Sequence, residues 1–237
     1  MLAIPHAMCG RRPVFPPTPA DFAAVTGKTV DAALYLHNEA SGNLIDYSSA
    51  SRNLTKNGAP TYLTSRNGRY GTLFPNSSAY FAATISGWNT AASFVFGGVT
   101  DFSSYAGAAT LMLIGGTNTV RLFMSGGQLY LYVADPAPFS AAISSGAVPT
   151  DTDPTLCLGQ IDLSTNTGRV IRARRGAYTT NSGSIASWAG IGTATPTVSV
   201  GSTAGSGLCP QYSMILTGSQ AEGASVLTDL AGALGWL

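Results

Sequence analysis

Length, composition and charge narrow the classes of protein to which this chain can belong. The chain has 237 residues, enough for one large all-β domain, and only 10% of them are charged, against roughly 25% in an ordinary soluble domain. Its 12 basic and 11 acidic residues leave a formal net charge of +1, so no overall field draws it to nucleic acid or to an anionic membrane. No uninterrupted run of about 18 apolar residues is present. We therefore expect neither nucleic-acid binding nor a membrane-spanning helix.

The first 30 residues are predicted to form an extended arm. Its prolines fix φ and remove backbone donors, which disfavours a helix; they are Pro5, Pro13, Pro16, Pro17 and Pro19. Pro5 interrupts the first apolar stretch and the basic pair follows that stretch, so the segment does not have the pattern of a secretory signal. We expect the arm to dock on neighbouring subunits of a protein assembly through Arg11, Arg12, Phe15, Pro16 and Pro17.

Residues 31–237 have the sequence pattern of an all-β sandwich. Short runs of β-branched, aromatic and leucine residues alternate with Gly, Asn, Ser and Pro. The predicted strands cover residues 33–36, 72–74, 80–83, 93–99, 110–114, 120–124, 128–133, 155–163, 169–175, 197–200 and 211–216. The turns at 125–127 and 164–168 predict tight hairpins, because their residues tolerate positive φ. The Ala-, Ser-, Thr- and Gly-rich segments 140–154 and 178–196 are predicted to be long loops.

The alternation within residues 128–133 predicts a strand with one buried face. Leu129, Leu131 and Val133 fall on one side of such a strand. Tyr130 and Tyr132 fall on the other side. The tyrosine side is either a second packing layer or a binding surface.

One helix is predicted, close to the C-terminus. Ser219 and Glu222 have the spacing of a capping box. Apolar residues then recur at helical spacing, namely Val226, Leu227, Leu230 and Leu234. We expect this apolar stripe to pack on the sandwich, with Trp236 closing the edge of the domain.

Four stretches of the domain carry motifs in an order that matches a known family. The segment 32–58, AALYLHNEASGNLIDYSSASRNLTKNG, places Glu39, Gly42, Asp46 and Gly58 around an opening strand, a turn and a loop. The stretches GRYGTLFPNSSAYFAA (68–83), GQIDLSTNTGRVIRARRG (159–176) and VSVGSTAGSGLCPQYSMILTGSQAEGASVLTDL (198–230) continue the order. Together they resemble the laminin-G-like or concanavalin A-like jelly rolls. The resemblance implies a two-sheet antiparallel jelly-roll sandwich, a fold shared by lectins, adhesion modules, glycosidases and structural proteins.

The sequence offers few groups for catalysis, and we expect no enzyme. Glu39 and Glu222 are its only glutamates, and the Glu-x-Asp-x-x-Glu motif of the sandwich-fold glucanases is absent. A nucleophilic serine would need His6 or His37 as its base, and no G-x-S-x-G elbow is present. We interpret His37 as a hydrogen-bonded residue at the end of a strand.

Calcium is the one metal that the loops suggest, and no other cofactor is expected. Asp46, with Glu39 and Asn43 nearby, would supply the hard oxygen ligands that calcium prefers. The alternative is that Asp46 caps the Ser-rich turn that follows it. Cys157 and Cys209 are either bridged in an oxidising compartment or free and buried.

Two groups of side chains are candidates for contact with a ligand or partner. The first is basic and lies on one predicted strand: Arg169, Arg172, Arg174 and Arg175. These guanidinium groups either bind carboxylates of an acidic glycan or partner protein, or keep an edge strand from aggregating. The second is aromatic and suited to stacking on sugar rings: Tyr130, Tyr132, Trp88 and Trp188.

Low charge, the proline-rich arm and the scarcity of catalytic groups favour a non-enzymatic structural or interaction protein of a large assembly. Our main hypothesis is a bacteriophage virion component, a capsid decoration or tail protein whose jelly roll faces outward. Its partners would be neighbouring capsid or tail subunits and a glycan. The alternative hypothesis is a free carbohydrate-binding or adhesion module of the laminin-G or concanavalin A type, extracellular or at the cell surface.

Overall fold

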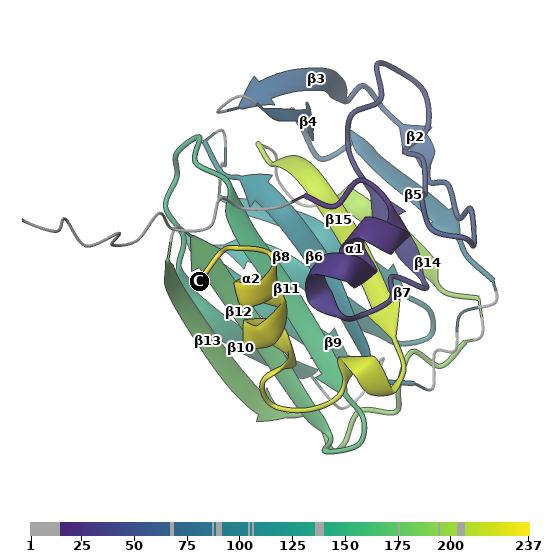
Figure 1. The fold of residues 1–237 in the computed structure, drawn as a ribbon, viewed down its shortest axis with the longest axis vertical. Helices are drawn as coiled ribbons and strands as arrows, with labels where there is room; N and C mark the ends of the chain where they lie inside the picture. The colour runs from purple at the N-terminus through teal and green to yellow at the C-terminus, as the bar shows by residue number, and fades with distance from the viewer. Residues whose placement is uncertain are drawn as a thin grey trace, which may run out of the picture.

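Two antiparallel sheets face each other in the computed structural model (Figure 1). The structure describes residues 15–66, 69–86, 88, 92–103, 105, 107–135, 140–174, 176–193, 195–202 and 207–237. The predicted contact residues Arg11, Arg12 and Arg175 lie outside the described residues. The predicted all-β, two-sheet antiparallel sandwich is confirmed.

The first sheet has six strands, in the order β1 (Ala33–Tyr35), β15 (Cys209–Thr217), β6 (Phe94–Asp101), β11 (Thr155–Asp162), β12 (Thr167–Arg174) and β13 (Ala177–Ser184). The second has seven, in the order β10 (Ser140–Ala147), β9 (Gln128–Ala134), β8 (Thr119–Ser125), β7 (Ala108–Gly115), β14 (Thr197–Ser202), β5 (Tyr80–Thr84) and β2 (Thr55–Asn57). A two-stranded sheet pairs β3 (Thr61–Arg66) with β4 (Arg69–Leu73), and β4 packs against β15.

The main core lies between the two large sheets. Every second residue of β8 and β9 points into it, as the alternating burial of both strands shows. A tight turn joins these two strands, with φ of 54° at Gly126 and 75° at Gly127. Because the turn fixes the register, Tyr130 and Tyr132 face outward, as the sequence predicted.

A second core lies on the opposite face of the six-stranded sheet. The helices α1 (Pro19–Thr26) and α2 (Val226–Ala233) cover this face in Figure 1. Strands β6 and β11 are therefore buried at every residue, since helices cover one face and the other sheet covers the second. Phe22, Leu230 and Trp236 are buried in this helix-covered core.

Helix α1 corrects the prediction of an extended arm through residue 30. The Thr18 side chain accepts a hydrogen bond from the Asp21 amide at 3.2 Å, Pro19 is the first helical residue, and Gly27 ends the helix at a φ of 67°. A proline at the first helical position loses no hydrogen bond, because the amide there has no partner within the helix. One of the prolines of this segment, Pro19, thus begins a helix.

The predicted strands are all present, but the prediction misses strands at the edges of the two sheets. Each predicted strand overlaps a strand of the structure. However, the segments predicted to be loops contain β10 and β13, which form one edge of each sheet. β13 is exposed along most of its length, so it needs no apolar residues and gives no apolar pattern.

The predicted capping box is also wrong in its details. Residues Ser219–Ala221 form a short 3₁₀ turn, and α2 begins only at Val226. Glu222 accepts a hydrogen bond from the Ser93 hydroxyl at 3.1 Å instead of capping a helix. The apolar stripe of α2 does pack on the sandwich as expected.

Candidate functional site

The two predicted sugar-binding tryptophans belong to the core. Trp88 is 5% exposed and Trp188 is 7% exposed, and both lie between the sheets. The Trp88 ring packs edge-on against Phe94, with 5.3 Å between the ring centroids. Neither tryptophan offers a ring face for stacking on a sugar, so this part of the prediction is wrong.

Two of the described arginines of β12, Arg169 and Arg174, form ion pairs within their own chain. Arg169 donates to Asp162 at 2.9 Å. Arg174 donates to Asp151 at 2.8 Å and to Asp153 at 2.7 Å. These ion pairs anchor loops to the sheet and neutralise the charge that a ligand would need.

Strand β12 also lies inside its sheet, between β11 and β13, so the alternative that its charges protect a sheet edge is wrong. Arg172 is half-buried and lies opposite Cys157 in the strand pairing. Cys157 and Cys209 are both buried and are not bridged to each other, and burial raises the pKa of the Cys157 thiol. Because Arg169 and Arg174 are in ion pairs and Arg172 is half-buried, the predicted basic patch is not a continuous charged surface.

Asp46 caps the turn that follows it. Its Oδ1 accepts from the amides of Leu34 at 2.9 Å and Ser48 at 2.8 Å. Its Oδ2 accepts from the Ser48 hydroxyl at 2.7 Å and from the Arg52 amide at 2.7 Å. Four donors occupy the two oxygens, so the geometry favours the turn cap over a calcium ligand.

The other two predicted calcium ligands are also engaged with backbone amides. Glu39 accepts from the Ile45 amide at 3.1 Å, and Asn43 accepts from the Lys56 amide at 3.2 Å. Burial raises the pKa of Glu39, which disfavours its charged form. Within the part of the chain that the structure describes, no three His, Cys, Asp or Glu side chains are grouped as metal ligands.

His37 is a structural residue, as we interpreted it from the sequence. It is fully buried, and its Nε2 lies 3.0 Å from the Ser213 hydroxyl. Burial lowers its pKa to about 3, so the ring is neutral near pH 7. A hydroxyl buried beside a neutral imidazole at the end of β1 has no access to a substrate.

The described residues of the predicted arm contact their own domain. Phe15 packs edge-on against Tyr212 and Trp236, with ring centroids 5.8 Å and 6.1 Å apart. Tyr212 donates a hydrogen bond to the Pro16 carbonyl at 3.2 Å, and Pro17 is exposed. This end of the segment therefore belongs to the folded domain.

Four side chains on the outward face of β8 and β9 contact one another. Tyr130 stacks on Phe123 with ring centroids 5.3 Å apart, and Tyr132 meets the same ring edge-on at 6.2 Å. The Arg121 guanidinium lies over Phe123 at 4.4 Å and over Tyr132 at 4.6 Å. These four side chains, here called the aromatic platform, form one connected surface.

Small neighbours leave the aromatic platform open. On the adjacent β10, Ala142 lies opposite Tyr132 and Ser144 lies opposite Tyr130. Polar groups border the rings, since the Gln128 amide oxygen accepts from the Tyr130 hydroxyl at 3.2 Å and from the Ser144 hydroxyl at 2.8 Å. The result is a partly exposed set of rings with hydrogen-bonding groups at its border.

The sequence prediction found only half of this platform. It singled out the tyrosines but not Arg121 and Phe123, which the pairing of β8 with β9 brings beside them. The sequence contained this information, because residues 119–125, which precede the turn of the predicted hairpin, also show the alternating pattern of a strand. Reading both strands of the hairpin together would have placed all four side chains on one face.

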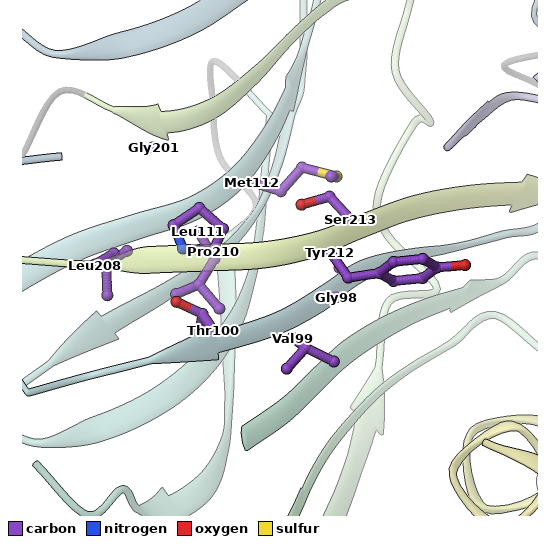
Figure 2. Close-up of a pocket in the computed structure, with 11 residues that line it drawn as sticks. Gly98, Val99, Thr100, Leu111, Met112, Gly201, Leu208, Pro210, Tyr212 and Ser213 are labelled. Carbon is purple, nitrogen blue, oxygen red and sulfur yellow. The ribbon is translucent and has the colours of Figure 1, made fainter. Parts of the chain in front are cut away.

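The cavity between the sheets is not a ligand site. Figure 2 shows its lining, which comes mainly from β6, β7 and β15. Its volume is about 10 Å³, which is room for one water molecule. The strands approach closely here, since a Cβ on Gly98 would lie 1.8 Å from the Tyr212 carbonyl oxygen.

No protein-family model matches the chain, and no curated protein matches it. Solved structures do. The binding domain of botulinum neurotoxin DC, solved in complex with rat synaptotagmin II, superimposes with a TM-score of 0.65 at 9% identity, covering 88% of this chain and 52% of that one. The same neurotoxin domain in complex with SialylT gives a TM-score of 0.62 at 12% identity, covering 85% and 50%.

A phage protein shares the architecture as well. Tailspike protein 2 of Escherichia coli O157:H7 bacteriophage CAB120 gives a TM-score of 0.50 at 13% identity, covering 70% of this chain and 26% of the tailspike. The chain has a concanavalin A-like fold. This concanavalin A-like sandwich spans about half the length of the neurotoxin chains that it matches. None of its described helices is long and apolar enough to cross a membrane.

Proposed function

We propose that the chain is a non-enzymatic glycan-binding module and that the aromatic platform is its binding surface. The observation that carries the proposal is the cluster of Phe123, Tyr130 and Tyr132 on the outward side of a sheet, where packing in the core does not require aromatic rings. The fold supports it, because the similar neurotoxin structures are binding domains and one of them was solved with SialylT.

The chemistry of the aromatic platform suits a sugar. A pyranose ring has an apolar face of C–H groups, which packs on an aromatic ring, and a rim of hydroxyls, which need hydrogen bonds. Tyr130 and Tyr132 supply ring faces and hydroxyls, and Gln128 and Ser144 supply further polar groups beside them. Arg121 holds the rings in place through its contacts with Phe123 and Tyr132.

A glycan array tests this function. We expect the wild-type chain to bind a limited set of glycans and Tyr132→Ala to lower the affinity for them about tenfold, the effect of losing one stacked ring. Tyr178→Ala is the matched control, because Tyr178 is 49% exposed on β13, in the other sheet. Equal loss in both variants, or no glycan bound by the wild type, would contradict the proposal.

A second proposal concerns where the module works. We propose that it is carried on a bacteriophage particle as part of a capsid or tail assembly, which the similarity to a phage tailspike and the low content of charged residues (10%) support. Light scattering of the full chain and of a variant without residues 1–14 tests this assembly role. The deletion ends before Phe15 because that ring packs on the domain. Oligomers that need residues 1–14 are the expected result, and a monomer in both cases would count against it.

A further inference from the structure

Arg121 is the only charged residue of the aromatic platform and of the strands around it. Strands β7, β8, β9 and β10 contain no other charged residue. In the whole seven-stranded sheet, the one further charged residue is Lys56, which lies on β2 at the edge far from β8. Asp135, which follows β9, accepts a hydrogen bond from the Ala189 amide at 3.2 Å. Among the described residues, Arg121 therefore has no carboxylate as a partner.

The hydrogen-bond donors of Arg121 also lack acceptors. Other arginines of the chain have them, since Arg52 donates to the Ala32 carbonyl at 2.6 Å and Arg169 donates to Asp162 at 2.9 Å. Arg121 instead contacts the ring faces of Phe123 and Tyr132. A ring face attracts a cation but has no lone pair, so it does not satisfy an N–H donor as an oxygen does.

The two terminal nitrogens of Arg121 are the atoms that a ligand can reach. The Nε atom is buried and has no hydrogen-bond partner, so it is closed to a ligand. Nη1 and Nη2 are not buried in this way, and no residue in the part of the chain that the structure describes forms a hydrogen bond with them. Because two rings hold the guanidinium in place, these donors lose little freedom when a ligand binds.

The strand pairing places Arg121 where a stacked ligand would meet it. Arg121 lies directly opposite Tyr132 on β9 and opposite Leu113 on β7, whose side chain offers no acceptor. A sugar that packs on Tyr132 or Phe123 would bring its own substituents next to the terminal nitrogens. A carboxylate suits this position, because its two oxygens accept two parallel N–H bonds from one guanidinium.

The bound sugar would strengthen such an ion pair. An exposed ion pair contributes little, because water and salt screen it. A sugar ring packed on the aromatic rings excludes water from one side of the guanidinium, so a carboxylate attached to that sugar meets Arg121 at a lower effective dielectric constant. A carboxylate without a sugar lacks this advantage. A sugar that carries a carboxylate should therefore bind more tightly than either group alone.

We propose that the aromatic platform recognises a carboxylate-bearing sugar, such as a uronic acid or a sialic acid, and that Arg121 binds its carboxylate through Nη1 and Nη2. This inference rests on the function proposed for the platform and names the class of sugar that the platform selects. Tyr130 and Tyr132 supply the ring faces and hydroxyls for the sugar itself. Arg121 then has two roles, because it holds the rings and also selects an acidic ligand.

Titrations followed by NMR with matched probes test the selection. The acidic probes are the methyl glycosides of glucuronic acid, galacturonic acid and N-acetylneuraminic acid. Each is paired with its carboxamide, which has the same shape without the charge, and sodium acetate supplies a carboxylate without a sugar. We expect at least one acid to bind about tenfold or more tightly than its own carboxamide and than acetate. If no acid bound more tightly than its carboxamide, or if acetate bound as tightly as the best acid, the proposal would be wrong.

Two variants separate ligand binding by Arg121 from its support of the rings. Arg121→Gln removes the charge and should lower the affinity for the best acid about tenfold or more, while the affinity for its carboxamide stays within about twofold. Arg121→Lys keeps the charge but not the paired donors, so it should recover only part of the lost affinity. Lys56→Gln removes the other cation of the same sheet and is the matched control, which should change neither affinity. Equal losses for acid and carboxamide in Arg121→Gln would show that Arg121 only holds the rings, and would overturn its assignment.

The glycan array distinguishes failure of this inference from failure of the proposed function. We expect the glycans that the wild-type chain binds to carry carboxylates, and Arg121→Gln to lose them. If the bound glycans were neutral and Tyr132→Ala lost them, the platform would still bind glycans, but its assignment to acidic sugars would be wrong. If the array showed no bound glycan at all, the proposed function would fall together with this inference.

Discussion

Asp162 offers a stringent test of how the sandwich is held together, because one buried carboxylate joins three parts of the chain. At the end of β11, its Oδ2 accepts from Arg169 of β12 at 2.9 Å and from the Gly223 amide before α2 at 3.1 Å. Its Oδ1 accepts from the Ser164 hydroxyl at 2.6 Å and from the Thr165 amide at 3.3 Å. Asp162→Asn removes the charge and replaces one acceptor oxygen with a donor.

The contacts of Asp162 determine how much stability the Asp162→Asn variant should lose. Removing one partner of a buried ion pair costs about 3–5 kcal/mol. The Arg169 side chain keeps 13% exposure and a contact of 3.3 Å with the Gln160 oxygen, so we expect the lower end, about 3 kcal/mol. For a domain of this size, that lowers the melting temperature by roughly 6–12 °C.

The loss should also depend on pH. Burial alone would raise the pKa of Asp162, but the hydrogen bonds from Ser164, Gly223, Arg169 and Thr165 outweigh it and hold the pKa well below its usual range. The carboxylate therefore stabilises the fold above the pKa of an unfolded aspartate, about 4, and this contribution is lost as the pH falls from there through the folded pKa. The difference between wild type and variant should be largest near pH 7 and shrink below about pH 4.

Thermal unfolding followed by circular dichroism at several pH values measures this difference. Asp153→Asn is the matched control, because Asp153 pairs with Arg174 near the surface and Asp151 remains to hold the same arginine. We expect it to cost less than about 1 kcal/mol. A loss for Asp162→Asn no larger than that of the control, or a gap that stays constant down to pH 3, would refute the reasoning.

Two further variants test residues that the sequence had offered as a metal ligand and as a catalytic base. Asp46→Ala leaves four donors unpaired and should cost about 3 kcal/mol, while added calcium should leave the wild-type melting temperature unchanged; a rise of several degrees with calcium would contradict the cap. His37 has a pKa of about 3 when folded and about 6.5 when unfolded, so the wild type should lose roughly 2 kcal/mol between pH 6.5 and pH 5. His37→Asn, which tolerates the φ of 53°, should lose much less over that range, and equal losses would show that another group titrates.

The sequence was informative wherever one face of a strand is buried. Residues 128–133 alternate because Leu129 and Leu131 must enter the core, so the strand, its hairpin and the outward direction of Tyr130 followed from the pattern. The edge strands β10 and β13 were missed for the converse reason. They are held by pairing with β9 and β12 more than by buried side chains, and pairing leaves no periodicity in the composition.

The sites were harder to predict than the strands, because residue type does not show burial. Trp88 and Trp188 have the chemistry of sugar-binding residues but fill the space between the sheets, whereas Phe123 resembles a core residue and lies outside. The same ambiguity affected Arg169, whose partner Asp162 lies on the neighbouring strand of the hairpin. Strand pairing, which sequence patterns constrain only locally, decides the roles of Phe123 and Arg169.

The most direct test of the glycan-binding account is to map the bound ligand. Amide chemical-shift changes on isotope-labelled protein, titrated with the best ligand from the array, should be concentrated in β8 and β9 and around Ser144 of β10. Tyr132→Ala should remove them without altering the spectrum of the helix-covered core. Changes confined to another surface, such as β13 or the helices, would contradict the assignment of the aromatic platform as the glycan-binding surface.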